Sequence, residues 1–342
     1  MRSGVSTALS PPPRRNLITD IAGIAVGNAE DAKVRTGVTV VVPKRPAVAG
    51  VAILGGAPGT HETDLLDPTC LVDHVDAVVL SGGSAFGLEA TAGVMNELAA
   101  AGAGFKIRNA AVPIVPGAIL FDLLNGGDKN WGDNPPYRAL GKQAFANAGE
   151  SFALGNVGAG YGARAAGLKG GLGSASWITE DGFIVGALVA VNSFGSPLIP
   201  NTPYFWAAAL EQNGEFGGRG LPAAPPRLDL EPEKSTKPYF SPANTTLAVV
   251  ATNAVLSKTQ ARRIAIMAHD GIARAIRPAH SPYDGDSVFA LATGEHPIKG
   301  PVDLFRLGAI AADCLARAIA RAIYEASDLG DARAYRSLHG PQ

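Results

Sequence analysis

The 342-residue sequence contains little charge and almost no cysteine. Charged residues make up 17% and the net charge is −1, so no excess positive charge attracts nucleic acid or an anionic membrane. The N-terminus lacks the apolar core of a signal peptide, and no apolar run reaches the ~18 residues of a membrane span. We therefore expect a cytoplasmic protein that binds neither nucleic acid nor membrane. Its two cysteines, Cys70 and Cys314, are predicted to be buried free thiols.

Several common catalytic motifs are also missing. Residues 162–169 approach a phosphate-binding loop, but Leu168 stands where the lysine is required. The six histidines are scattered without zinc spacing, and Asp284-Gly285-Asp286 lacks the further carboxylates of an EF-hand. Ser84 is not a nucleophile elbow, because Phe86 replaces the second glycine. We expect no nucleotide, no metal and no cofactor. The glycine-dense middle of the chain is instead predicted to let backbones pack closely.

Apolar residues make up 46% of the chain, with 42 glycines and 25 prolines, which is typical of a folded core with many turns. Strand and helix patterns alternate, which predicts a mixed α/β sandwich in one unit over residues 16–342, preceded by a loose arm at 1–15. Residues 213–243 read as an irregular surface linker. Strands are predicted at 37–42, 51–54, 75–80, 183–191, 245–252 and 287–293. Helices are predicted after an N-cap at Ser84, with Leu88, Ala92, Met95 and Leu98 as the apolar stripe, after a capping box at Ser257 and Gln260, and over 303–327.

The chain changes character at Asn244-Thr245, where the Pro-rich segment meets a buried strand. If this peptide bond were cut, Thr245 would carry a free α-amine beside its own hydroxyl. An α-amino group has a pKa of about 7.7–8.0, so at neutral pH it can accept the hydroxyl proton. One residue would then supply both nucleophile and base. From the local sequence alone, however, an Asn-Thr-Thr stretch at the start of a strand is more often only the start of a strand than a cleavage site.

Several motifs around this junction occur in an order that resembles the DmpA-type family of self-cleaving aminopeptidases. That family includes L-aminopeptidase/D-esterase, β-aminopeptidases and endo-type nylon-oligomer hydrolases. The resemblance runs from about residue 16 to 327. Its motifs are Leu80–Ala90, Pro113–Asp122, Gly158-Ala159-Gly160, Lys169-Gly170-Gly171, Val189–Asn192, Asn244-Thr245-Thr246 and Asp284-Gly285-Asp286.

The resemblance implies a four-layer α/β/β/α fold of the type shared with ornithine acetyltransferases. It also implies cleavage into an α chain, 1–244, and a β chain, 245–342, which assemble as a homo-oligomer, commonly a tetramer of αβ units. The implied reaction is hydrolysis of amide bonds in small peptides or amino-acid oligomers through an acyl-enzyme, without a cofactor.

Site roles implied by the resemblance are carried over position by position. Thr245 would be the nucleophile, Asn192 an oxyanion-hole donor and Lys169 a positioning cation. Asp284 and Asp286 would orient the Thr245 amine and hydroxyl. Phe121 and Ser84 would contact the substrate.

Two departures from the family pattern concern the nucleophile and the oxyanion hole. Phe121 stands where some members carry a tyrosine hydroxyl donor, which leaves open what completes the oxyanion hole. The Asn-Thr junction resembles the nylon-oligomer hydrolases more than the Gly-Ser junction of many aminopeptidases. The sequence does not separate an aminopeptidase from an endo-hydrolase of 6-aminohexanoate oligomers. Acyl transfer and an uncleaved, non-catalytic binding protein remain as alternatives.

Overall fold

The fold is built around β14 (Thr245–Val255), which crosses the middle of the larger sheet. In the computed structural model, which describes residues 15–224 and 244–340, the first ten residues of this strand are buried. Successive side chains alternate between two cores. Leu247 and Val249 face the smaller, five-stranded sheet, and Ala248 and Val250 face the two helices that cover the opposite side. A strand covered on both faces favours apolar residues along its length, which explains the apolar run from 247 to 251. The buried polar residues Thr245, Thr246, Thr252 and Asn253 lie toward the two ends of the strand.

Two sheets lie face to face and make up the inner layers. The smaller has five strands in the spatial order β1 (Ile24–Asp31), β2 (Thr36–Pro43), β6 (Val78–Ser81), β9 (Gly117–Ile119) and β4 (Thr60–His61). The larger has six strands in the order β12 (Gly171–Ile178), β13 (Ile184–Asn192), β14, β15 (Ser287–Pro297), β3 (Ala47–Ile53) and β5 (His74–Val75). Two-stranded ribbons are formed by β7 (Phe105–Ile107) with β8 (Ala110–Val112), and by β10 (Arg164–Ala165) with β11 (Leu168–Lys169).

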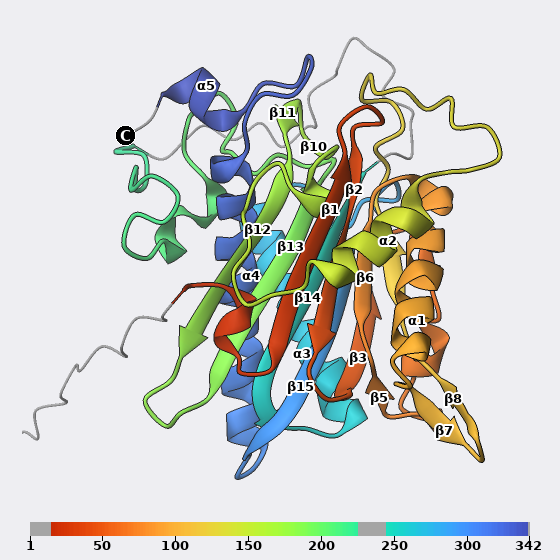
Figure 1. Ribbon diagram of the computed structural model, residues 1–342. Coiled ribbons are helices and arrows are strands. Elements are labelled where there is room, and N and C mark those ends of the chain that lie inside the picture. Colours follow the sequence, from red (N-terminus) through yellow and green to blue (C-terminus); the bar gives the residue numbers. More distant parts are fainter. Residues whose placement is uncertain (1–14, 225–243, 341–342) are drawn as a thin grey trace, which may run out of the picture.

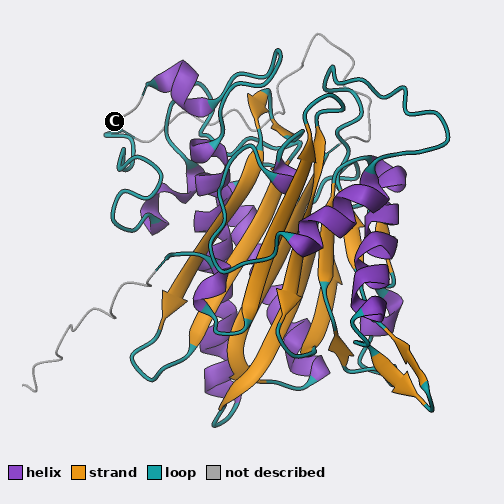
Figure 2. Ribbon diagram, viewed as in Figure 1, coloured by secondary structure: helices purple, strands orange, loops and turns teal. Residues whose placement is uncertain are grey.

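Helices form the two outer layers (Figures 1 and 2). A core cluster joins α1 (Glu89–Ala100) and α2 (Tyr137–Ala146) to the smaller sheet, and another joins α3 (Lys258–Ala275) and α4 (Pro301–Glu325) to the larger sheet. A short helix, α5 (Tyr335–His339), lies near the C-terminal end of the described chain. Among the described residues, five short 3₁₀ segments complete the elements: η1 (Ile18–Asp20), η2 (Asp64–Leu66), η3 (Ser84–Leu88), η4 (Gly158–Gly160) and η5 (Trp206–Leu210). The predicted α/β/β/α order of layers is confirmed.

Helix starts were predicted correctly in one case and wrongly in another. The capping box of α3 is present: Ser257 Oγ accepts from the Gln260 N–H, and the Gln260 side chain accepts from the Ser257 N–H. Ser84 is not an N-cap, because it begins the 3₁₀ segment η3 with a φ of +52°, and α1 begins only at Glu89. Gly83 before it has a φ of +88° and packs on the Tyr137 ring, so tertiary contacts set the backbone here.

The buried face of α1 also differs from the predicted stripe. Leu98 is buried as predicted, but Leu88, Ala92 and Met95 are only half-buried. The buried positions include Gly93, where an added Cβ would lie 2.1 Å from a backbone oxygen of α2. Close packing against α2 therefore turns the helix so that small residues face inward.

Glycines of the middle segment allow close backbone packing, as predicted. A Cβ on Gly173 of β12 would lie 2.0 Å from the Ala318 carbonyl oxygen of α4, and one on Gly160 would lie 2.1 Å from the Leu172 nitrogen. Any larger residue at these two positions would force the layers apart.

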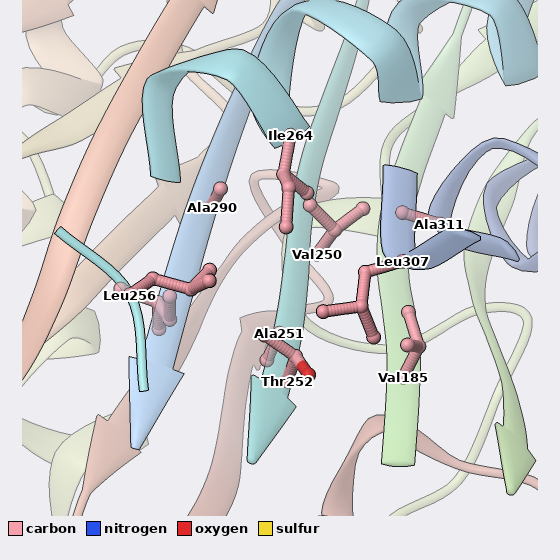
Figure 3. Close-up of a pocket in the computed structure, with 10 residues that line it drawn as sticks. Val185, Val250, Ala251, Thr252, Leu256, Ile264, Ala290, Leu307 and Ala311 are labelled. Atoms are coloured by element: carbon pink, nitrogen blue, oxygen red, sulfur yellow. The ribbon is translucent and has the colours of Figure 1, made fainter. Parts of the chain in front are cut away.

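The core beneath α3 and α4 contains a small apolar void (Figure 3). Ile264 of α3 and Leu307 of α4 point into it, opposite Val185 and Val250 of the sheet. Its volume of about 10 Å³ is close to the minimum for one water, and its walls are almost wholly apolar. It is a packing defect rather than a substrate site.

Cys314 is a free, buried thiol, as predicted, and burial raises its pKa to about 12. Cys70 is also free, but it is only half-buried, because it lies in a surface loop where its Sγ contacts the Asp64 carbonyl oxygen at 3.4 Å. Residues 1–14 of the predicted arm and 225–243 of the predicted linker lie outside the described residues. In the described ranges, no helix is long and apolar enough to cross a membrane, and no group of three or more His, Cys, Asp or Glu side chains could hold a metal ion.

Candidate active site

Thr245 lies where the ends of three neighbouring strands meet. It is the first residue of β14, and the register of the antiparallel pair places it directly opposite Asn192, the last residue of β13. Asn244 forms a parallel bridge with Asp284, just before β15. The Thr245 side chain is only 4% exposed. Residues separated by more than ninety positions of sequence are thus brought together by strand pairing.

The Thr245 hydroxyl lies against the carbonyl group of the preceding residue. Its Oγ1 is 2.5 Å from the Asn244 oxygen, to which it donates a hydrogen bond. The Gly285 N–H donates to both oxygens, at 3.0 Å to the Asn244 carbonyl and 3.2 Å to Thr245 Oγ1. A Cβ at Gly285 would lie 2.7 Å from Oγ1, so only glycine fits beside this hydroxyl. The Asn244 carbonyl therefore receives two donors while a hydroxyl oxygen lies next to it.

Within the described part of the chain, the side chains of the two aspartates bind Thr246 and Phe194 rather than Thr245 itself. Asp286 Oδ1 accepts from the Thr246 N–H at 2.8 Å. Asp284 Oδ1 accepts from the Phe194 N–H at 3.2 Å. Both carboxylates are 2% exposed. These bonds hold the start of β14 and the segment after β13 against the loop that contains Gly285.

Asp284 is electrostatically perturbed. Burial raises the pKa of this carboxyl, and the neighbouring charge of Asp286 raises it further. Hydrogen bonds from Ser281 act in the opposite direction, with the Ser281 N–H at 3.0 Å and its Oγ at 2.5 Å from Oδ2. A buried acid pair with one raised pKa is typical of sites that handle protons.

Asn192 is oriented by contacts to two other segments. Its Oδ1 accepts from the Arg164 N–H at 2.8 Å, and its Nδ2 donates to the Phe121 carbonyl oxygen at 3.0 Å. Phe121 thus contacts Asn192 through its main-chain carbonyl, and its ring has no donor to replace a tyrosine hydroxyl. Ser84 belongs to the neighbouring loop, where its N–H bonds to the Leu120 carbonyl oxygen.

Lys169 of β11 lies just before β12, near the end of the larger sheet where β13 ends and β14 begins. Gly171 pairs with Val191 in the β12–β13 register, which places Lys169 close to the end of β13. Its Nζ donates to the Gly160 and Gly170 carbonyl oxygens at 2.9 and 2.8 Å. Burial lowers the pKa of this amine to about 7, against the attraction of Asp122. Burial therefore disfavours the charged form of this amine.

Asp122 joins two neighbouring segments of the site, its own segment after β9, which carries Phe121, and the segment after β6, which carries Ser84. It is buried, and it accepts from Thr36 Oγ1 at 2.6 Å and from the Gly83 N–H at 2.8 Å. Burial raises the pKa of this carboxyl. These two segments are thus held to the smaller sheet by a buried acid.

Comparison with known proteins identifies the family of the chain. The sequence model of peptidase family S58 matches residues 16–336, nearly the whole chain. The chain belongs to peptidase family S58. The DmpA-type resemblance predicted from the motifs is confirmed, and membership of this family makes the chain a hydrolase.

Relatives of this S58 chain carry two kinds of name. An uncharacterized aminopeptidase of Mycobacterium tuberculosis is 44% identical over 342 residues, covering 94% of this chain and 98% of the relative. The 6-aminohexanoate-oligomer endohydrolase of a Kocuria species is 27% identical over 329 residues, covering 90% of this chain and 86% of the relative. The L-aminopeptidase D-Ala-esterase/amidase of Ochrobactrum anthropi shares the fold, with a TM-score of 0.71, 22% identity, and coverage of 96% and 94% of the two chains.

Two residues that contribute to the candidate active site, Gly285 and His280, were not predicted from the sequence. Gly285 lies inside the Asp284-Gly285-Asp286 motif, but nothing in that motif indicates that its N–H reaches the Asn244 carbonyl. His280, which contacts Asp286, had no motif at all. Both act through contacts that depend on which strands are neighbours, and only the folded chain reveals that.

Proposed function

We propose that this S58 hydrolase matures by cutting its own Asn244–Thr245 bond and then uses Thr245 as an N-terminal nucleophile. The observation that supports this most strongly is the contact between Thr245 Oγ1 and the Asn244 carbonyl, with the Gly285 N–H donating to that same carbonyl oxygen. Because the Thr245 hydroxyl already lies beside the Asn244 carbonyl group, which already accepts hydrogen bonds, attack on that carbonyl needs little movement of the hydroxyl.

In the maturation step, Thr245 Oγ1 adds to the Asn244 carbonyl carbon and the Gly285 N–H stabilises the oxyanion. The carbon–nitrogen bond then breaks, and the hydroxyl proton is transferred to the departing Thr245 nitrogen. Water hydrolyses the resulting ester to an Asn244 carboxylate and a free Thr245 hydroxyl. Each atom is accounted for by the two residues and one water. A threonine with a free α-amine remains.

In turnover, the Thr245 amine accepts the hydroxyl proton while Oγ1 attacks a substrate amide. The leaving amine takes up this proton, and water later releases the acyl group. Asp286 holds the first residues of β14 through Thr246, and the buried Asp284 is the proposed partner of the new ammonium group. Asn192 and the Gly285 N–H are the proposed oxyanion donors, which supplies a second donor where the Phe121 ring has none.

Small peptides with a free amino end are the favoured substrates, because the relatives at 44% identity are named aminopeptidases. The second candidate is an endo-acting hydrolase of 6-aminohexanoate oligomers, favoured by the Asn-Thr junction and by relatives at 27% identity. Dipeptides, their N-acetylated forms and 6-aminohexanoate oligomers separate the two. An aminopeptidase loses activity on N-acetylation, whereas an endo-hydrolase cuts internal bonds of the oligomer.

Denaturing mass spectrometry of wild type, Thr245→Ala and Thr245→Ser tests the nucleophile. We expect wild type to separate into two chains, the smaller beginning at Thr245, and Thr245→Ala to remain whole, because it lacks the hydroxyl. Thr245→Ser keeps the hydroxyl and is expected to be cut. A cut that persists in Thr245→Ala would refute the mechanism. An intact wild-type chain without amidase activity would favour a binding protein.

A further inference from the structure

His280 makes two contacts to one oxygen of Asp286. Its ring Nδ1 lies 2.8 Å and its backbone nitrogen 3.1 Å from Asp286 Oδ2. Because a carboxylate oxygen accepts, both nitrogens donate. His280 lies on the loop between α3 and Asp284, and its side chain is 21% exposed.

The backbone at His280 is strained in a way that serves this contact. Its φ is +55°, a left-handed conformation that is unfavourable for a residue with a Cβ. Such conformations persist where the surroundings require them and gather at functional sites. Here the surroundings are the two bonds to Asp286 and the ring of a second histidine.

That second histidine is His269 of α3, whose ring packs edge-on to the His280 ring with centroids 4.9 Å apart. Its Nε2 lies 2.9 Å from the Ala52 carbonyl oxygen, so Nε2 carries the hydrogen. Burial lowers the pKa of His269 to about 4, which keeps its ring neutral. His269 is therefore a fixed, uncharged surface against which the His280 ring is held.

The other oxygen of Asp286 connects this pair to the nucleophile. Asp286 Oδ1 accepts from the N–H of Thr246, the residue after Thr245, at 2.8 Å. A continuous path of contacts runs from His280 through Asp286 to the start of β14. If the Asp286 carboxylate rotated, its hydrogen bond from the Thr246 N–H, next to Thr245, would be lost.

We propose that His280 is a positioning residue that clamps Asp286 and thereby aligns Thr245 with the acyl group it attacks. This inference rests on the proposed role of Thr245. The ring N–H is the part of His280 that matters, because it fixes one carboxylate oxygen and so directs the other to Thr246.

Two substitutions that both tolerate a positive φ separate the ring donor from the backbone conformation. His280→Gly keeps the backbone N–H and relieves the strain, but removes the ring donor. His280→Asn supplies an amide N–H close to the position of Nδ1 and also adopts left-handed φ readily. His74→Asn, at an exposed histidine of β5, is the matched control. Self-cleavage rate, kcat and KM of the mature enzyme, and melting temperature are measured for each.

We expect His280→Gly to lower the self-cleavage rate and kcat about 10- to 100-fold, the range for a lost hydrogen bond to a charged group, with KM nearly unchanged. His280→Asn is expected to restore both rates to within about threefold at the same melting temperature, since it restores one such bond. Rates like wild type in His280→Gly, or equal losses in both variants, would overturn the inference. If wild type itself is never cut, the proposed function fails instead.

Discussion

Substitution of Gly285 by alanine tests the reacting geometry most directly. An added Cβ would lie 2.7 Å from Thr245 Oγ1 and 3.0 Å from the Ala57 carbonyl oxygen. The first distance is shorter than real Cβ contacts allow, so the hydroxyl or the loop has to move. The φ of Gly285 is not in the left-handed region, so alanine adds no backbone strain. The effect is therefore steric, and its tightest contact is with the Thr245 hydroxyl.

The expected magnitude follows from that displacement. Moving a reacting group by up to about 1 Å costs on the order of 100-fold in rate. Displacing a donor from an oxyanion costs about 100- to 1,000-fold. We expect Gly285→Ala to slow self-cleavage about 100-fold while the chain keeps a cooperative melting transition.

Cell-free synthesis followed by timed denaturing gels measures this rate from the moment the chain is made. Gly149→Ala is the control, because a Cβ there meets nothing within 4 Å and its φ is not left-handed. It is expected to be cut at the wild-type rate. If Gly285→Ala is cut as fast as Gly149→Ala, the contact between Gly285 and Thr245 Oγ1 is not the reacting arrangement.

Two further predictions concern stability and are measured by urea unfolding in a Thr245→Ala background. Burial lowers the pKa of Lys169 from 10.5 to about 7, so between these values the unfolded chain binds the extra proton. The stability from this group is complete above pH 10.5 and is lost as the pH falls toward 7, with a slope of up to ~1.4 kcal/mol per pH unit. Lys169→Met should remove that slope, and an unchanged slope would contradict the assignment. Glu215 pairs with Arg317 at 2.6 Å, both nearly buried, so Glu215→Gln should cost about 3–5 kcal/mol by leaving a buried cation unpaired, and a loss below about 1 kcal/mol would show that water reaches the pair.

Local sequence patterns predicted much of the larger sheet and its helices. The predicted strand at 245–252 became β14, because both faces of this strand are covered and its middle residues, 247 to 251, are all apolar. The capping box at Ser257 formed because its hydrogen bonds join residues three apart and need no distant partner. The N-cap at Ser84 was wrong because Asp122 and Tyr137, which are distant in sequence, set the backbone at Gly83.

For the candidate site, the sequence by itself determined which residues to examine: the ordered motifs drew attention to Thr245, Asn192 and the Asp-Gly-Asp loop. Only the tertiary structure decided how they meet. Strand register sets Asn192 opposite Thr245, and the neighbouring loop brings the Gly285 N–H to the Asn244 carbonyl and His280 to Asp286. The physical reason is that these contacts are hydrogen bonds between strands and loops far apart in sequence. Their partners are chosen by burial of the sheet's two faces, and no local pattern records that choice.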